Sequence, residues 1–243
     1  MSVKRIDITS DLQCPFCLIG VKQMLNAVEK YKSNNPSSTE YQIRLLPYQL
    51  DPSLTEEPKS RIEEYNKKFG PEKAQQIMSS MGPRLENLGY KCDYGGTVSS
   101  THLVHRLQTY VLMTKPEVQI PLAMDIFKGF HGYQKDPNDK QWLSSLSIQH
   151  GIFKTEDEAV NWLNGKDLDE QVKQSYLIAR KLGVTGVPFF LFQDKYAASG
   201  AMGEDEFVKL LEEIDRREST PKQDQHPVLA RGESCGEKDA IVA

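Results

Sequence analysis

Two cysteines, Cys14 and Cys17, are the residues whose type and spacing point most directly to chemistry. Pro15 and Phe16 separate them, and this spacing puts the two sulfurs one turn apart if a helix begins here. Unpaired N–H groups at a helix N-terminus favour a negative charge, so we expect the Cys14 thiolate to be stabilised there. Cys17 is then close enough to close a disulfide. The pattern predicts thiol–disulfide exchange, with Cys14 as the nucleophile and Cys17 as the resolving thiol.

Simple magnitudes limit how acidic Cys14 becomes through this placement. A charge at a helix end is stabilised by at most about 2 kcal/mol, and one pKa unit corresponds to about 1.36 kcal/mol. An ordinary thiol has a pKa of about 8.5, so the helix alone lowers the pKa of Cys14 to about 7 to 8. Phe16 adds neither a charge nor a side-chain donor. We therefore predict a redox couple of moderate potential.

Three other interpretations of the cysteine pair stay open. A structural zinc site needs more ligands, and the candidates, His102 and His105, lie far beyond the spacing of a zinc finger. Alternatively, the two cysteines are unreactive apolar residues buried at the start of a helix. The third interpretation is a binding module that has the same fold without redox turnover.

The elements around the pair follow from hydrophobic periodicity. Residues 3 to 10 alternate as in a strand, and an apolar stripe that begins at Cys17 predicts a helix with Pro15 in its first turn. A second strand is expected from about Tyr41 to Leu46. In the last third we expect a helix over about 168–182 that ends at Gly183, strands at 189–192 and 196–199, and a final helix.

Residues 58–165 have a helical pattern, and we interpret them as a helical insertion of four to six segments. Helix starts are indicated by two capping boxes and two first-turn prolines: Ser60 with Glu63, Thr155 with Glu158, Pro71 and Pro116. The domain prediction is a discontinuous α/β core of residues 1–57 and 166–217, with the insertion between its two parts. Residues 218–243 are polar and lack an apolar stripe, so we expect a flexible tail.

Composition narrows the function classes. The chain has 243 residues and a net charge of -4, which argues against nucleic acid or an acidic membrane surface as a partner. Its apolar runs are shorter than the roughly 18 residues that a membrane span needs. The N-terminus lacks the pattern of a secretory signal, so we expect a cytoplasmic, reducing location. Cys92 and Cys235 are isolated in the sequence, which disfavours a disulfide scaffold. The sequence leaves the oligomeric state open.

Two motifs carry a resemblance to a known family. The first runs from Ser10 through Cys14 and Cys17 to Gly20, and the second spans residues 183–190, Gly-Val-Thr-Gly-Val-Pro-Phe-Phe. With both present, the chain resembles the DsbA-like thioredoxin superfamily over about residues 3 to 215. It looks most like the FrnE-like branch, which has a similar Thr-x-x-x-His-Arg-Leu stretch to residues 101–107. The resemblance implies an α/β thioredoxin-like fold with a large helical insertion.

The resemblance also implies site residues and partners. Val187–Pro188 is expected to be a cis peptide that faces the cysteine pair, so that the backbone before Pro188 can pair with an extended substrate. Pro15, Phe16, Val187 and Pro188 are thus the expected substrate-binding residues. The implied substrates are disulfides or thiols of proteins or small molecules. No cofactor is implied, and glutathione or thioredoxin is the expected redox partner. Because of Phe16, we expect a less oxidising couple than in the strongly oxidising DsbA type.

Several residues and one alternative enzyme class remain open. His105 and Arg106 fit a packed helix better than a catalytic role, and the Asp11 charge opposes a nearby thiolate. FrnE-like proteins can carry a second Cys-x4-Cys, but Ala240 stands where the partner of Cys235 is needed, which favours an unpaired surface thiol. The alternative is a glutathione-dependent isomerase or transferase, of the 2-hydroxychromene-2-carboxylate isomerase or kappa-class type. Those enzymes use a hydroxyl residue instead of a cysteine pair.

Overall fold

The computed structural model describes residues 3–36, 40–219, 229–233 and 235–236. Among these residues, no helix combines the length and the apolar composition needed to cross a membrane. The strands are β1 (Val3–Ser10), β2 (Glu40–Pro47), β3 (Lys59–Ser60), β4 (Thr97–Val98), β5 (Gly186–Val187), β6 (Phe189–Phe192), β7 (Tyr196–Ser199), β8 (Leu229–Arg231) and β9 (Cys235–Gly236). The helices are α1 (Pro15–Asn34), α2 (Arg61–Phe69), α3 (Pro71–Glu86), α4 (His102–Thr114), α5 (Pro116–Gly132), α6 (Lys140–Gln149), α7 (Glu156–Asn164), α8 (Asp169–Lys181) and α9 (Glu204–Ser219).

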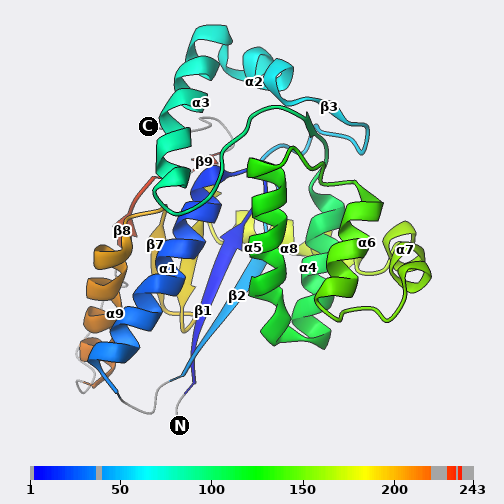
Figure 1. Ribbon diagram of the computed structural model, residues 1–243. Helices are drawn as coiled ribbons and strands as arrows, with labels where there is room; N and C mark the ends of the chain where they lie inside the picture. Colours follow the sequence, from blue (N-terminus) through cyan, green and yellow to red (C-terminus); the bar gives the residue numbers. More distant parts are fainter. Residues whose placement is uncertain (1–2, 37–39, 220–228, 234, 237–243) are drawn as a thin grey trace.

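A mixed sheet with the strand order β2-β1-β6-β7-β8 forms the centre of the molecule (Figure 1). β1 pairs with β2 in parallel and with β6 antiparallel, so Ile6 lies beside Ile43 and Ile8 beside Phe190. The β6–β7 pair is antiparallel and the β7–β8 pair is parallel. β1, β2, β6 and β7 lie where the sequence predicts strands, because apolar side chains recur there with the period of a strand.

Helices α1 and α9 pack side by side against the sheet (Figure 1). Their apolar stripes meet the apolar side chains of the strands in what we call the sheet cluster. This cluster consists of Ile6, Ile8, Val21, Met24, Ala27, Val28, Tyr31, Leu45, Ala123, Phe190, Phe192, Tyr196, Ala198, Phe207, Val208, Leu210, Leu211 and Ile214.

A second hydrophobic cluster, which we call the insertion cluster, joins the start of α1 to the helices that follow β2. It contains Cys14, Phe16, Cys17 and Val187 together with buried side chains of α3 to α7, among them Met81, Leu85, Leu107, Leu122, Phe127, Phe130, Leu143 and Leu163. In Figure 1, α2 and α3 lie above the first turn of α1, and α4 to α7 lie on the β2 side of the sheet. The helices α2 to α7 confirm the predicted helical segments. The division into separate domains stays a prediction.

The predicted helix starts in the insertion are confirmed. The Ser60 side chain accepts a hydrogen bond from the Glu63 N–H, and the Thr155 side chain accepts one from the Glu158 N–H. Pro71 and Pro116 begin α3 and α5. Each cap satisfies a backbone donor that the first turn of a helix leaves unpaired, which is why these positions could be located from sequence.

Part of the predicted tail, residues 218–243, has regular secondary structure where the structure describes it, and its flexibility stays a prediction. α9 continues to Ser219. β8 then pairs with β7, and β9 pairs antiparallel with β5, setting Gly236 opposite Gly186 and Cys235 opposite Val187. These strands are two or three residues long, too short for a periodic apolar pattern, and they form by pairing with strands that are distant in sequence. The other residues predicted as tail lie outside the described residues.

Candidate active site

The cysteine motif lies where β1 gives way to α1. Cys14 is the N-cap of α1, with an extended backbone conformation, and Pro15 is its first helical residue. The turn is closed by hydrogen bonds from the Cys14 N–H to the Asp11 carbonyl, at 3.1 Å, and from the Cys17 N–H to the Cys14 carbonyl, at 3.0 Å. The predicted position of Cys14 at the N-terminus of a helix is confirmed. Cys14 therefore lies at the end of α1 where the first-turn N–H groups have no partner within the helix.

Both thiols of the motif are fully buried. The Cys14 Sγ donates a hydrogen bond to the Val187 carbonyl at 3.4 Å. Burial raises the pKa of Cys17 well above its usual range, and hydrogen bonding to Cys14 raises it further. The Ser10 side chain and the Asp11 backbone act in the opposite direction. Cys17 is thus a neutral thiol near neutral pH, in hydrogen-bond contact with Cys14.

The second motif brings Val187 and Pro188 to the same place. The peptide between them is cis. Gly20, on the first turns of α1, makes the close approach to Pro188 feasible, because a Cβ at Gly20 would lie 2.8 Å from the Pro188 Cγ. Two motifs that are distant in sequence therefore meet, with the Val187 carbonyl directed at the Cys14 thiol.

The residues predicted to bind substrate are brought together, although none of them is exposed. Pro15 and Phe16 are buried at the start of α1, and Val187 and Pro188 are buried at the junction of β5 and β6. The Phe16 ring lies under the Arg84 guanidinium of α3, with 5.9 Å between the Arg84 Cζ and the ring centroid. Substrate binding by these residues stays a prediction.

Asp11 and His105 form a buried polar pair beside the motif. One Asp11 carboxylate oxygen accepts a hydrogen bond from the Leu50 N–H at 2.8 Å, and the other lies 3.3 Å from the His105 Nε2. His102 points elsewhere, with ring nitrogens 3.0 Å from the Tyr176 hydroxyl and 2.7 Å from an Asp169 oxygen. Burial lowers the pKa of His102, and the Asp169 carboxylate opposes that shift. Within the described part of the chain, no three His, Cys, Asp or Glu side chains gather as metal ligands.

Arg106, which the sequence left without a role, is also buried. Its Nε donates a hydrogen bond to the Asp167 carbonyl at 2.8 Å, and its guanidinium lies over the Trp162 ring, 5.3 Å from the centroid. Burial lowers the pKa of this guanidinium, against the pull of Asp169 and Asp167. These contacts join α4 to α7 and to the segment between α7 and α8.

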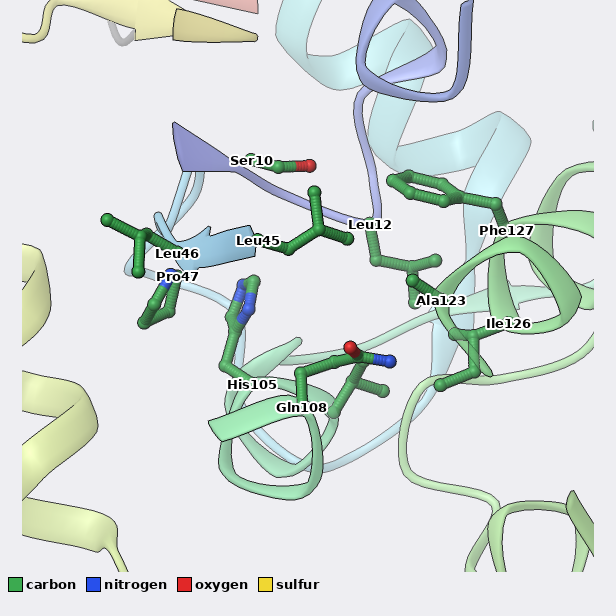
Figure 2. A pocket seen from close by; sticks show the side chains of 11 residues that line it. Ser10, Leu12, Leu45, Leu46, Pro47, His105, Gln108, Ala123, Ile126 and Phe127 are labelled. Carbon is green, nitrogen blue, oxygen red and sulfur yellow. The ribbon is translucent and has the colours of Figure 1, made fainter. Parts of the chain in front are cut away.

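A cavity of about 30 Å³ lies next to the buried pair of Asp11 and His105 (Figure 2). His105 and Gln108 reach into it from α4, and Ser10 lies across from them at the end of β1. Leu12 and the apolar side chains of β2 and α5 form the rest of the wall. Sites for organic ligands usually measure about 300–1,000 Å³. A molecule of the size of glutathione therefore does not fit in this cavity.

Three residues around the motif escaped the sequence analysis as site residues. His131 is buried on α5 and hydrogen-bonds the Leu12 carbonyl through Nε2 at 3.0 Å, which anchors the loop before Cys14. Burial, with a contribution from the nearby Arg61 charge, lowers the pKa of His131 to about 3. Ser10 could have been noticed as a polar residue at the end of a strand that leads into the motif. His131 and Arg84 have no local signal, because their partners are distant in sequence.

Several solved structures share this fold. The chain is similar to a probable DsbA oxidoreductase from Streptomyces coelicolor, with 24% identity, a TM-score of 0.77 and 99% of both chains covered. It is also similar to the cytosolic disulfide reductase DsbM from Pseudomonas aeruginosa with GSH (14% identity, TM-score 0.57, 87% of this chain and 99% of that chain). A 2-hydroxychromene-2-carboxylate isomerase is similar too (14% identity, TM-score 0.58, 88% of this chain and 95% of that chain).

At these identities the structural likeness establishes the fold. No curated protein matches the chain in sequence with statistical significance. The sequence profile of the DSBA-like thioredoxin domain matches residues 5–214, a span that includes both motifs and all the helices between them. With its fold and most of its length accounted for, the chain belongs to the DSBA-like thioredoxin domain family.

Proposed function

We propose that this protein is a thiol–disulfide oxidoreductase in which Cys14 attacks and Cys17 resolves. The observation that carries the proposal is the pair of buried thiols at the start of α1, with the Cys14 thiol hydrogen-bonded to the Val187 carbonyl. The Cys14 thiolate attacks one sulfur of a substrate disulfide and releases the other as a thiolate. Cys17 then loses its proton and attacks Cys14, which releases the second substrate thiol. The pair ends oxidised and the substrate reduced, and the reverse sequence oxidises a dithiol.

The different surroundings of the two thiols support this order of events. The raised pKa of Cys17 keeps it protonated while Cys14 reacts at the helix N-terminus. A protonated Cys17 can donate a hydrogen bond that stabilises the Cys14 thiolate. Once Cys14 is bound to the substrate, the neighbouring Cys17 is the thiol placed to attack it. In this proposal Cys14 therefore reacts with the substrate before Cys17 does.

The proposed substrates are disulfides or thiols of extended peptides and of small molecules, received at Pro15, Phe16, Val187 and Pro188. Glutathione is the proposed exchange partner among small thiols, since a structure of the similarly folded DsbM contains GSH. A cytoplasmic location belongs to this proposal, because a reducing compartment returns the pair to its dithiol form. Fractionation of cells that express the full chain, followed by immunoblotting, tests the location.

The test of the reaction is reduction of insulin by the purified protein with a thiol reductant. We expect Cys14→Ser to reduce the rate to that of the reductant alone, since the nucleophile is lost. Cys17→Ser should accumulate a mixed disulfide between Cys14 and the substrate, which mass spectrometry detects. Cys92→Ser is the matched control, because Cys92 is half-buried and lies outside the motif. Full activity of Cys14→Ser refutes the proposal.

The same variants separate the proposal from the glutathione-dependent isomerases and transferases. The double variant Cys14→Ser, Cys17→Ser has no thiol pair for exchange. If it retained glutathione-dependent conjugation or isomerisation, the second enzyme class would replace the first. Loss of all activity in this variant agrees with thiol–disulfide exchange.

A further inference from the structure

The end of the described chain returns to the cysteine motif. Residues 229–233 and 235–236, which we call the C-terminal strap, begin as β8 on the edge of the sheet beside β7. Glu233 then forms an antiparallel bridge with Ala201. The strap ends as β9, paired with β5 next to the first turn of α1 (Figure 1).

The strap is held by close backbone contacts. The Gly232 N–H donates to the Ser199 carbonyl at 2.5 Å, and Ala201 and Glu233 exchange hydrogen bonds of 2.7 and 3.0 Å. A Cβ at Gly232 would lie only 2.4 Å from the Ala201 carbonyl oxygen. Glycine at this position is therefore what permits the strap to lie so close to the end of β7.

A charged pair joins the strap to the helical insertion. Glu233 forms a salt bridge with Arg84 of α3. The guanidinium of Arg84 also lies over the ring of Phe16, inside the cysteine motif. Arg84, Gly232 and Glu233 line an open groove of about 680 Å³, and Ile19 of α1 lines it as well. The strap is thus part of the wall of a groove beside the helix that carries both cysteines.

The position of β9 places the strap on the edge of β5 beside the Cys14 thiol. The strap pairs with Val187, whose carbonyl accepts the hydrogen bond of the Cys14 thiol. An extended peptide that adds a strand beside the nucleophile needs the same backbone edge of β5. In the structure this edge is occupied by the chain itself, and a cysteine, Cys235, is the residue opposite Val187. Cys14 is fully buried in this arrangement.

We propose that the C-terminal strap is a built-in pseudosubstrate, which must leave β5 before a substrate can reach Cys14. The strap lies antiparallel to β5, with Cys235 opposite Val187, on the backbone edge that an extended substrate would use. This inference rests on the proposed function and adds to it an autoinhibited state. Because only the open form admits a reagent, the rate at which Cys14 reacts reports the fraction of molecules in which the strap is released.

The test is the rate at which iodoacetamide alkylates Cys14 in the reduced full chain. Peptide mass spectrometry measures the alkylated fraction of Cys14 separately from that of the other cysteines. Gly232→Ala adds a methyl group that collides with the Ala201 backbone. We expect alkylation to accelerate at least about fivefold, the factor that corresponds to the smallest usual cost of overpacking. Gly82→Ala on α3 is the matched control, because a Cβ there has no neighbour within 4 Å.

A charge exchange tests the strap without changing its backbone. Glu233→Arg places two positive charges together, and we expect a rise in the alkylation rate of about two- to fivefold, as for a partly exposed ion pair. The double variant Arg84→Glu, Glu233→Arg restores the pair and should return the rate toward that of the native chain. Thermal unfolding of each variant verifies that the rest of the molecule remains folded.

The outcomes separate this inference from the proposed function. Alkylation of Cys14 at the native rate in both Gly232→Ala and Glu233→Arg overturns the pseudosubstrate strap. In that case the loss of insulin reduction in Cys14→Ser still supports the oxidoreductase. Faster alkylation in Gly232→Ala and Glu233→Arg, with recovery in the charge-exchanged variant and no change in Gly82→Ala, supports the strap.

Discussion

The two parts of helix α1 pack into different hydrophobic clusters. One part holds the helix against the sheet, and the other carries the cysteine pair. Farther along α1, Val21, Met24 and Val28 belong to the sheet cluster with the strands and α9. At its start, Cys14, Phe16 and Cys17 belong to the insertion cluster with α3 to α7. The sheet thus fixes where α1 lies, while the helical insertion surrounds the thiols that it carries.

The two clusters also differ in the polar groups close to them. The loop before α1 and the helical insertion bury Asp11, Arg61, His105 and His131, whereas the buried Asp7 of β1 is ion-paired with Arg44. A buried polar group costs free energy unless it is bonded, and such groups gather where an environment must be tuned. We infer that the insertion cluster determines the reactivity of the cysteines and that the sheet cluster determines mainly the stability of the fold.

The largest expected effect comes from matched cavity substitutions in the two clusters. Leu107→Ala on α4 and Leu211→Ala on α9 each truncate a fully buried leucine and should cost about 2–5 kcal/mol of unfolding free energy. Urea unfolding measures this loss. Only Leu107→Ala should also shift the redox potential of the cysteine pair, by about 30 mV or more, which corresponds to about 1.4 kcal/mol. Equal shifts in the two variants contradict the division of roles.

The next effect concerns the resolving step at Cys17. Because burial raises the pKa of Cys17, its thiolate fraction should increase about tenfold per pH unit and continue to increase beyond pH ~8.5, the ordinary value of a thiol. Stopped-flow release of glutathione from a mixed disulfide with Cys14 measures this step. Ser10→Ala removes a hydrogen bond that lowers the pKa, so it should slow release at neutral pH. A plateau below pH ~8.5 disagrees with a buried neutral Cys17.

The smallest effect is the acid sensitivity that His131 confers. Its pKa is about 3 in the folded protein, against about 6.5 when unfolded, so the unfolded chain binds the proton between these values. Stability is therefore lost as the pH falls below about 6.5, with a contribution of about 1 kcal/mol between pH ~6.5 and ~5.5. His131→Gln keeps a donor for the Leu12 carbonyl and should remove this contribution in urea unfolding.

The outcome of this experiment is decided by the pH dependence alone. If urea unfolding of His131→Gln keeps the pH dependence of the native chain, His131 is not the source of the acid sensitivity.

Local patterns in the sequence were sufficient to predict most of the fold. β6 and β7 begin and end as predicted, and the caps at Ser60 and Thr155 were located because capping depends on residues only three positions apart. The position of Cys14 at a helix start followed from the same kind of local rule. The strands β8 and β9 could not be predicted, because they depend on an edge that other segments create.

The residues of the site also fall into two groups, those that sequence motifs predict and those that depend on packing between distant segments. Cys14, Cys17, Val187 and Pro188 were found through their two motifs, and the structure brings them together. The bond from His131 to Leu12 depends on how α5 packs against the loop before the motif, and no spacing in the sequence indicates it. The same holds for Arg84, whose partners belong to α1 and to the strap.

The central claim is that Cys14 and Cys17 form one reversible redox couple. The most direct measurement is a titration of the purified chain in glutathione buffers of defined potential, with acid quenching and mass spectrometry of the cysteine peptides. We predict a single two-electron transition that links Cys14 to Cys17, at a potential below the about −120 mV of DsbA. Two thiols that stay reduced across the whole range, or a disulfide that omits either cysteine, would contradict the account.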